Sequence, residues 1–231
     1  MQMQTTGAEK IGVVYKKNLG HYDVHHENKM ITCVPSAKLW KYLTKDLQRQ
    51  SGRAVTAVQG KQMDPIAVGD SVRFIPTSDG GGMILEVLPR RNYLARGSAK
   101  PMPGAHAFEQ VIAANLDQVV PVFAAADPTP RWHLLDRILV TAESYGLPSQ
   151  IVMTKTDLIY GRPEEPALLE AAERYRKIGY PVLFTSAKAG KGFESLRKAL
   201  AGRTSVLVGK SGVGKSSLLN RLEPGLGLRV K

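Results

Sequence analysis

Short runs in which apolar and polar residues alternate fill the first hundred positions of the chain. Turn-forming residues separate the runs, as in NLG after Lys17 and SDGGG after Thr77. Several short strands joined by turns are typical of a small β-barrel. The predicted strands are KIGVVYK from Lys10, HYDVHH from His21, MITCV from Met30, SVRFIPT from Ser71 and MILEVLP from Met83. The basic, less regular stretch from Ala37 to Ala54 is interpreted as a strand followed by a mobile loop.

The second half of the chain alternates between apolar strand-like runs and segments with helical periodicity. Such alternation predicts a parallel sheet with helices on both faces, and ligands of such sheets gather at the carboxyl ends of the strands. The predicted strands begin at Gln118, Gln150, Pro181 and Thr204, and the predicted helices begin at Arg131, Pro163, Gly192 and Ser216.

The segment between these two patterns is rich in Gly, Pro and Ala. It reads GSAKPMPGAHA, from Gly97 to Ala107, and has no periodicity, which is typical of a linker. We therefore expect a barrel domain over residues 1–105 and an α/β domain over residues 106–231.

The charge of the chain is strongly positive. Its 231 residues carry a net charge of +12, and residues 1–107 hold 15 basic against 8 acidic residues. This excess favours a polyanionic partner such as RNA or DNA, although it could serve solubility alone. Candidate contacts of the barrel are Lys16, Lys17, Lys41, Lys45, Arg49, Arg53, Arg90 and Arg91, with Trp40 and Tyr42 as possible stacking rings.

Several classes of protein are disfavoured by composition. The single cysteine, Cys33, excludes an internal disulfide and fits a reducing cytoplasm. The first ten residues have no apolar core, so we expect no secretory signal, and the run from Val119 is too short to span a bilayer. His21, His25 and His26 lack the partners and the spacing of a metal site, so we expect none there.

The stretch VLVGKSGVGKSSLLN, from Val206, fits the phosphate-binding loop pattern, in which Gly209, Gly214, Lys215 and Ser216 are the specified positions. It has a predicted strand before it and a predicted helix after it, which disfavours a chance match. Backbone N–H groups at a helix N-terminus attract phosphate, Lys215 would reach the β- and γ-phosphates, and the Ser216 hydroxyl would hold Mg²⁺. The predicted phosphate-binding residues are Gly209, Lys210, Ser211, Gly212, Val213, Gly214, Lys215, Ser216 and Ser217.

Two shorter motifs follow the predicted strands at Gln150 and Pro181. One is TKTD, formed by Thr154, Lys155, Thr156 and Asp157, and the other contains Ser186, Ala187 and Lys188. A carboxylate such as that of Asp157 can accept two hydrogen bonds from guanine, and adenine offers no such pair. The stem of Lys155 could cover the face of the base, and the Ala187 N–H could donate to guanine O6.

The order TKTD, then SAK, then GKSGVGKS resembles that of circularly permuted GTPases. The stretches ANLDQVV from Ala114, VMTKTDL from Val152 and GKSGVGKSSLLNRL from Gly209 are similar to the ribosome small-subunit-dependent GTPase A family, as are VGDSVRF and ILEVLPRRNYLAR in the first half. TKTD departs from the commoner Asn-Lys-x-Asp, but a threonine can still brace neighbouring loops. The resemblance implies an oligonucleotide-binding (OB-fold-like) β-barrel followed by a circularly permuted P-loop GTPase domain.

The resemblance also implies a function. The chain would bind GTP or GDP with Mg²⁺ and hydrolyse GTP with Lys215 and Ser216 in catalytic roles, Ser216 being the magnesium ligand. It would assist late maturation of the small (30S) ribosomal subunit and contact 16S rRNA through its barrel. We expect a cytoplasmic monomer with no membrane partner.

In this family a switch threonine, an Asp-x-x-Gly segment and a zinc-binding domain follow the phosphate loop. The sequence stops at Lys231 without them, so we expect a C-terminally incomplete GTPase domain with no zinc ligands and with weak nucleotide binding and hydrolysis. The strand TSVLVG would then be an unpaired edge of the sheet.

Two other functions stay open on sequence grounds. One is a non-catalytic RNA-binding module with a vestigial nucleotide site. The other is an ATP-dependent enzyme in which TKTD occurs by chance.

Overall fold

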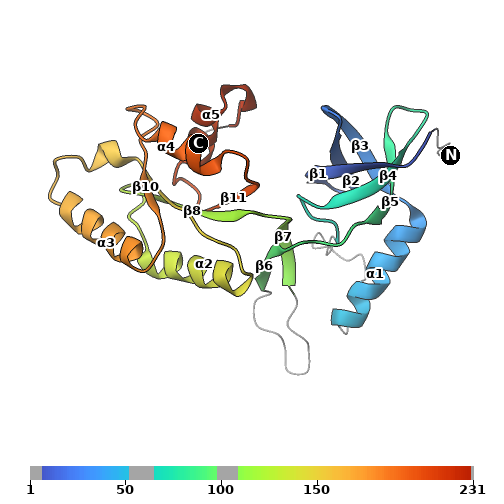
Figure 1. Cartoon of the computed structure of the whole chain (residues 1–231), viewed down its shortest axis with the longest axis horizontal. Helices are drawn as coiled ribbons and strands as arrows, with labels where there is room; N and C mark the ends of the chain where they lie inside the picture. Colours follow the sequence, from blue (N-terminus) through green and yellow to red (C-terminus); the bar gives the residue numbers. More distant parts are fainter. Residues whose placement is uncertain (1–6, 52–64, 98–108, 230–231) are drawn as a thin grey trace. The chain divides into compact units, whose positions relative to one another are not determined.

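The computed structural model describes residues 7–51, 65–97 and 109–229 of the chain (Figure 1). The chain divides into two compact units, Met1–Asn115 and Leu116–Lys231. The predicted boundary near residue 105 lies outside the described residues.

The first unit contains the predicted barrel. Its five strands close in the order β1-β2-β3-β5-β4, in which β3 and β5 are parallel and the other pairs are antiparallel. The strands are β1 (Lys10–Asn18), β2 (His21–His26), β3 (Lys29–Pro35), β4 (Ser71–Pro76) and β5 (Gly82–Val87). The five strands predicted from alternation are confirmed.

Alternate residues of these strands fill the barrel. Val14, Tyr22, Val24, Phe74 and Ile84 are all completely buried there, as the period of two along a strand requires. Cys33 lies among them, and burial, together with the nearby Asp23, raises the pKa of its thiol to about 12. The one cysteine is therefore an unreactive part of the barrel core.

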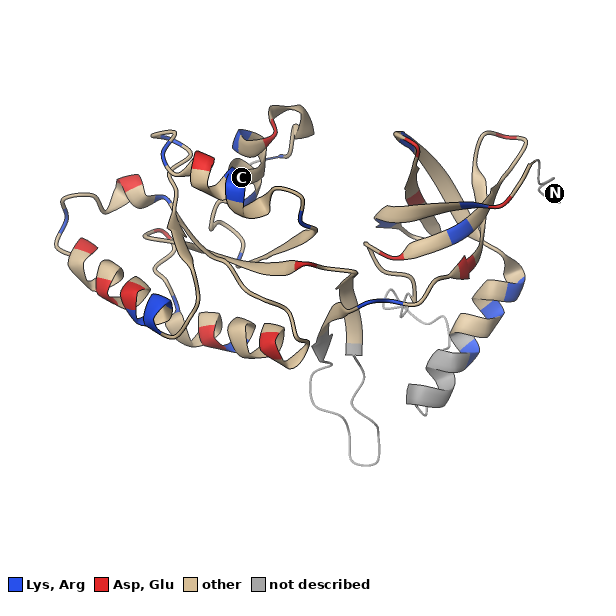
Figure 2. Ribbon diagram, viewed as in Figure 1, with Lys and Arg blue, Asp and Glu red and all other residues tan. Residues whose placement is uncertain are grey.

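The basic stretch after β3 is a helix, α1 (Ala37–Ser51), and its interpretation as a strand with a mobile loop was wrong. The Ser36 hydroxyl accepts a hydrogen bond from the Leu39 N–H at 3.2 Å, which caps the first turn. Leu39 and Leu43, one turn apart, pack against the barrel core. This helical spacing of two leucines outweighs the irregular polar pattern around them. Figure 2 shows basic residues, in blue, along the part of this helix that is drawn in colour.

One predicted RNA contact, Arg90, is instead part of the structure of the barrel. Its guanidinium donates to both carboxylate oxygens of the fully buried Asp70, at 2.7 and 2.8 Å, and to the Pro65 carbonyl at 2.9 Å. A buried carboxylate without its partner costs several kcal/mol, roughly 3–5. Arg90 is therefore committed to Asp70 and is not available to a nucleic acid.

A two-stranded antiparallel sheet, not predicted from the sequence, completes the first unit. It consists of β6 (Tyr93–Gly97) and β7 (Glu109–Ala114). The predicted linker, Gly97–Ala107, starts at the last residue of β6 and otherwise lies outside the described residues.

The second unit contains the predicted parallel sheet. Its strands lie in the order β10-β9-β8-β11, and all three pairings are parallel. The strands are β8 (Gln118–Ala124), β9 (Ile151–Thr154), β10 (Val182–Phe184) and β11 (Ser205–Val208), and the helices are α2 (Trp132–Ser144), α3 (Glu165–Lys177), α4 (Phe193–Leu200) and α5 (Lys215–Leu222). As expected, the apolar strand β11 lies at an end of the described sheet.

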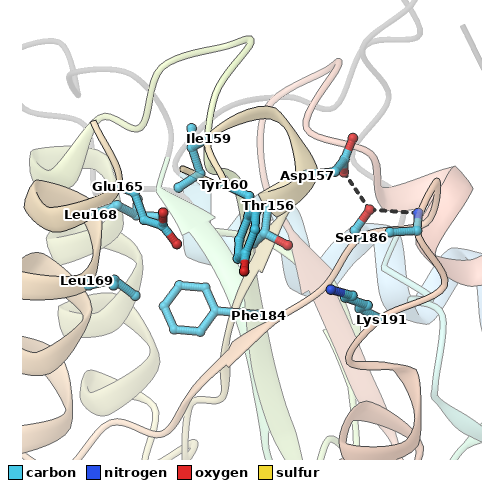
Figure 3. Close-up of a pocket in the computed structure, with 11 residues that line it drawn as sticks. Thr156, Asp157, Ile159, Tyr160, Glu165, Leu168, Leu169, Phe184, Ser186 and Lys191 are labelled. Atoms are coloured by element: carbon cyan, nitrogen blue, oxygen red, sulfur yellow. Dashed lines mark hydrogen bonds between the residues drawn. The ribbon is translucent and has the colours of Figure 1, made fainter. Parts of the chain in front are cut away.

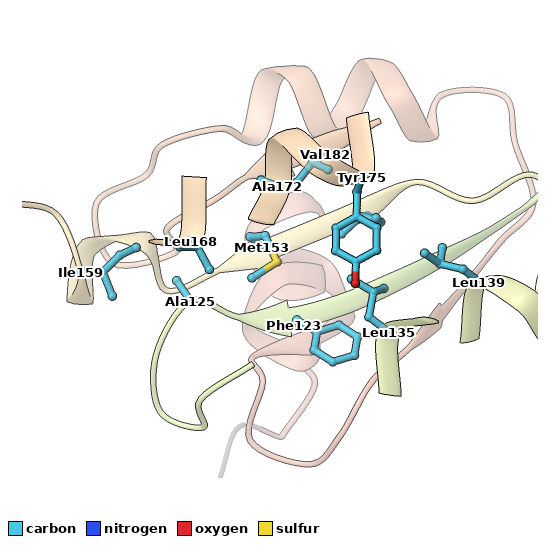
Figure 4. Packing of buried hydrophobic residues seen from close by; sticks show 11 residues of the cluster. Phe123, Ala125, Leu135, Leu139, Met153, Ile159, Leu168, Ala172, Tyr175 and Val182 are labelled. Atoms are coloured by element: carbon cyan, nitrogen blue, oxygen red, sulfur yellow. The ribbon is translucent and has the colours of Figure 1, made fainter. Parts of the chain in front are cut away.

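Helices cover both faces of this sheet. Phe123 of β8 and Met153 of β9 point to one face, where they pack with Leu135 of α2 and Leu168 of α3 (Figure 4). Their neighbours Val120, Val122 and Val152 point to the other face, against Phe193 and Leu196 of α4 and Leu218 of α5. The fold is therefore a barrel unit followed by a doubly covered α/β unit, as the sequence predicts.

Candidate nucleotide-binding site

Three loops lie at the carboxyl ends of three strands. The TKTD motif ends β9 and continues into the short 3-10 helix η1 (Thr156–Leu158), the SAK segment follows β10, and the phosphate-loop motif follows β11. Because the strands are parallel, their carboxyl ends share one edge of the sheet. Residues far apart in the sequence thus meet at that edge.

Hydrogen bonds join the three loops directly. The buried Thr154 hydroxyl donates to the Val213 carbonyl of the phosphate loop at 2.5 Å, and the Phe123 carbonyl oxygen lies 3.3 Å from the same hydroxyl. The Thr156 hydroxyl donates to the Thr185 carbonyl at 3.2 Å. Thr154 thus links the TKTD motif to the phosphate loop, and Thr156 links the TKTD motif to the segment after β10.

The glycines of the phosphate loop are required by its path. A Cβ on Gly209 would lie 2.3 Å from the Val122 carbonyl oxygen, so no larger residue fits there. Gly212 and Gly214 have φ of 83° and 90°, in the left-handed region that favours glycine. α5 begins immediately after Gly214, so its unpaired first N–H groups border this loop.

A cavity of about 240 Å³ lies over the loop. It is lined by Lys155, Ser211, Gly212, Gly214, Lys215, Ser216, Ser217 and Arg229. The ammonium of Lys215 donates to the Gly209 and Lys210 carbonyls, both at 2.8 Å, which holds the side chain across its own loop. Three of the lining side chains are cationic and none is a carboxylate, so the cavity attracts an anion. Helix N-terminal N–H groups add to that attraction.

The TKTD motif borders this cavity through Lys155, and its Asp157 is joined to the segment after β10. The half-buried Asp157 accepts a hydrogen bond from the Ser186 hydroxyl at 2.5 Å through Oδ1, and that hydroxyl accepts one from the Ala189 N–H at 3.0 Å (Figure 3). Lys155 has a left-handed backbone, with φ of 56°, and its ammonium donates to the Asp127 carbonyl. Ser186 thus fixes the orientation of the Asp157 carboxyl group.

A second cavity, of about 420 Å³, borders the same two residues. Asp157 and Ser186 lie at one side of it, and Ile159, Leu168 and Phe184 form an apolar wall between η1, α3 and β10 (Figure 3). The segment that carries Asp157 therefore borders a cavity with an apolar wall.

The structure sorts the predicted site residues into groups. Those that line the smaller cavity are Lys155, Ser211, Gly212, Gly214, Lys215, Ser216 and Ser217. Gly209, Lys210, Val213 and Thr154 shape its wall through hydrogen bonds, while Thr156, Asp157 and Ser186 line the larger cavity. Ala187 and Lys188 are exposed on the loop after β10. Sequence reasoning missed Arg229, which no motif marks.

A family model described as RsgA GTPase matches residues 87–231, which include all three loops. The chain belongs to the RsgA GTPase family.

Curated relatives that carry the family's name have similar sequences. The chain is 46% identical over 167 residues to a protein of Gemmatimonas aurantiaca and 43% identical over 169 residues to one of Ectopseudomonas mendocina, both named Small ribosomal subunit biogenesis GTPase RsgA. These alignments cover 71% of this chain and 52% and 46% of the two relatives. The chain therefore spans about half the length of the curated relatives it matches.

Two solved structures resemble the chain along nearly its whole length. YjeQ from Thermotoga maritima has a TM-score of 0.68 and 32% sequence identity, and the match covers 96% of this chain and 68% of that one. YloQ, titled a circularly permuted GTPase, has a TM-score of 0.61 and 30% identity, with 94% and 66% covered. The RsgA-like fold thus includes the barrel as well as the α/β unit.

Two further observations concern the described residues alone. They contain no group of three or more His, Cys, Asp or Glu side chains arranged to hold a metal ion. None of their helices combines the length and the apolar character that crossing a membrane requires.

The link between Thr154 and the phosphate loop gives a first prediction. Thr154→Val keeps the shape of the side chain but removes the hydroxyl, so the Val213 carbonyl loses its donor. We expect a loss of about 1–3 kcal/mol in the free energy of unfolding. We also expect faster hydrogen exchange at residues 213–216, measured by mass spectrometry. Thr154→Ser, which keeps the hydroxyl, is the control. Unchanged exchange in the valine variant would show that this bond does not order the loop.

Proposed function

We propose that the chain binds GTP and hydrolyses it to GDP and phosphate while assisting late maturation of the small ribosomal subunit. The observation that carries the proposal is the cationic cavity in which Lys155 of the TKTD motif meets Lys215 and Ser216 of the phosphate loop. A motif for a guanine base and a motif for a phosphate chain thus share one site.

The phosphate half of the site suits charge stabilisation. In hydrolysis a water oxygen bonds to the γ-phosphorus and releases a proton to the solvent, the bond from that phosphorus to the bridging oxygen breaks, and GDP leaves with the electron pair of that bond. Lys215 and the N–H groups at the start of α5 would stabilise this developing charge. The Ser216 hydroxyl, which lines the cavity, fits a Mg²⁺ ligand. The ion, when bound, neutralises charge on the phosphate oxygens.

The base half of the site suits guanine. Ser186 occupies one oxygen of Asp157 and fixes the plane of the carboxyl group, which can then face the N1–H and N2–H₂ donors of guanine. The Ala187 N–H makes no hydrogen bond within the described part of the chain, so it can donate to O6. We assign guanine recognition to Thr154, Lys155, Thr156, Asp157, Ser186, Ala187 and Lys188, and phosphate binding to the loop from Gly209 to Ser217.

The barrel supplies surfaces that fit RNA. Lys38, Lys41, Tyr42 and Lys45 are exposed and recur at helical spacing along one face of α1, opposite the leucines that pack on the barrel. On the strands, the rings of Tyr15 and His25 stack with centroids 4.7 Å apart and an interplanar angle of 14°, and Tyr15 is 56% exposed. Proteins that bind single-stranded nucleic acids typically use lysines to contact the phosphate backbone and exposed aromatic rings to stack on the bases.

The names of the relatives support the choice of partner. Proteins 46% and 43% identical to this chain are named for small ribosomal subunit biogenesis. We therefore propose the 30S subunit as the partner and 16S rRNA as the polyanion that the barrel contacts. Residues 1–105 would serve RNA binding and residues 106–231 nucleotide binding, in a cytoplasmic monomer. Zinc has no fitting ligand set among the described residues, and we assign it no role in them.

Base selectivity tests the guanine assignment. Asp157→Asn replaces one acceptor by an amide N–H₂, which suits the carbonyl at position 2 of xanthine. We expect GDP affinity to fall by about tenfold or more, since a charge-assisted pair is lost, and XDP affinity to rise. Titration with fluorescent GDP, XDP and ADP measures all three affinities. Equal GDP affinity in the two proteins would remove Asp157 from the site, and preference for ADP in the wild type would favour the ATP-dependent alternative.

Hydrolysis is tested by phosphate release from GTP with and without 30S subunits. We expect the subunits to stimulate release, and Lys215→Ala to abolish that stimulation because the transition-state charge loses its cation. Lys198→Ala, which removes an exposed lysine of α4 outside the cavity lining, is the matched control. Guanine nucleotide binding without any turnover would reduce the proposal to a binding protein. Absence of any nucleotide effect would favour an RNA-binding module with a vestigial site.

The salt dependence of rRNA binding tests the lysine face of α1. Each phosphate contact to single-stranded RNA contributes about 0.7 to the slope of log affinity against log salt. We expect Lys38→Ala with Lys45→Ala to lower that slope for 16S rRNA by about 1.4, twice this value. Lys177→Ala with Lys198→Ala removes the same charge from the α/β unit and should leave the slope unchanged. Equal slopes in the wild type and both double variants would contradict the assignment.

A further inference from the structure

The chain turns back on itself after α5, and a side chain fixes that turn. A 3-10 helix, η2 (Pro224–Leu226), is followed by Gly227 in the left-handed region, with φ of 54°. Asn220 of α5 then holds the backbone of Leu228 through two hydrogen bonds. Its Nδ2 donates to the Leu228 carbonyl at 2.7 Å, and its Oδ1 accepts from the Leu228 N–H at 2.8 Å. The Asn220 side-chain amide thus binds both backbone polar groups of Leu228 and fixes the position of that residue. We call this pair of hydrogen bonds the Asn220 clamp.

The next residue, Arg229, lies at the cavity over the phosphate loop. Its side chain lines the cavity together with Lys155, Gly212, Lys215 and Ser216. The turn at Gly227 and the Asn220 clamp are therefore what brings an arginine from beyond α5 to the loop that precedes the helix.

The guanidinium of Arg229 is suited to bind an anion. Arg90 is paired with Asp70, and Arg197 donates to the Leu222 carbonyl, whereas Arg229 forms no ion pair or hydrogen bond with any described residue. It lies instead in a cavity with two lysines, where like charges repel. Bound phosphate oxygens would remove that repulsion, and the planar guanidinium can donate two parallel hydrogen bonds to them.

We propose that Arg229 is a phosphate-binding residue of the nucleotide site, positioned by the Asn220 clamp on Leu228. The inference rests on the proposed nucleotide-binding function and adds to it a cation outside the three sequence motifs. Arg229 contacts the phosphate chain, and Asn220 acts only through the backbone that it holds. Since the contacts are to phosphate, they are independent of the base.

Equilibrium binding of fluorescent GDP to the 231-residue chain tests the inference. We expect Arg229→Ala to weaken GDP binding by about tenfold, the effect of one charge-assisted contact, and Arg229→Lys to weaken it less because the charge remains. Asn220→Ala keeps the Arg229 side chain but removes the two hydrogen bonds that position it, so it should reproduce much of the loss. Arg221→Ala removes the same charge from α5 outside the cavity lining and should stay within about twofold of the wild type.

Two further readings separate a phosphate contact from a general effect. The loss in Arg229→Ala should be the same for XDP binding in the Asp157→Asn background, since the base plays no part. It should also be smaller for GMP than for GDP, because GMP offers fewer phosphate oxygens. Thermal melting in the absence of nucleotide should be unchanged in Arg229→Ala, whose side chain is exposed.

The outcomes distinguish this inference from the function on which it rests. If the wild type binds GDP and Arg229→Ala binds it with the same affinity, the role of Arg229 is overturned and the proposed function stays intact. Equal losses in Arg229→Ala and Arg221→Ala would also overturn it, by showing an effect of net charge alone. No GDP binding by the wild type would instead overturn the proposed function, and this inference with it.

Discussion

Parallel pairing of β8, β9, β10 and β11 brings the carboxyl ends of these strands to one edge of the sheet, and every proposed nucleotide contact depends on that alignment. The order in which the strands occur along the chain does not affect which edge their ends share. A phosphate loop after the last strand can therefore meet a motif from much earlier in the chain, as the hydrogen bond between Thr154 and the Val213 carbonyl, 59 positions apart, shows. Circular permutation changes the connections between strands and keeps the site.

Packing on both faces fixes the position of the strands that end at this edge. Alternate residues of β8 and β9 point to opposite faces, and helices cover both, so the strands are fixed from two sides. The backbone of the phosphate loop then passes so close to β8 that only glycine fits at position 209. Within this frame the charged groups are placed by local contacts, such as those of Lys215 with its own loop and of Ser186 with Asp157. The site is thus preorganised by hydrogen bonds that involve no ligand.

Much of the fold follows from patterns of period two and period 3.6 in the sequence. Alternation located all five barrel strands, and strand–helix alternation located the whole parallel sheet. The same reasoning failed at α1, where the many polar and basic residues make the helical spacing of Leu39 and Leu43 hard to recognise. It also failed at β6 and β7, because pairing between strands separated by an intervening segment leaves no local signal in the sequence. Arg90 was misread as a surface contact because its partner Asp70 is 20 positions away. Arg229 was overlooked for a similar reason, since its position depends on the Asn220 clamp.

The claim that three separated loops form one guanine nucleotide site is tested most directly by amide NMR during a titration with GDP and Mg²⁺. We expect the signals of residues 154–157, 186–188 and 209–217 to shift together, with a single dissociation constant, and ADP not to reproduce the shifts. Shifts confined to residues 209–217, or equal shifts with ADP, would contradict it.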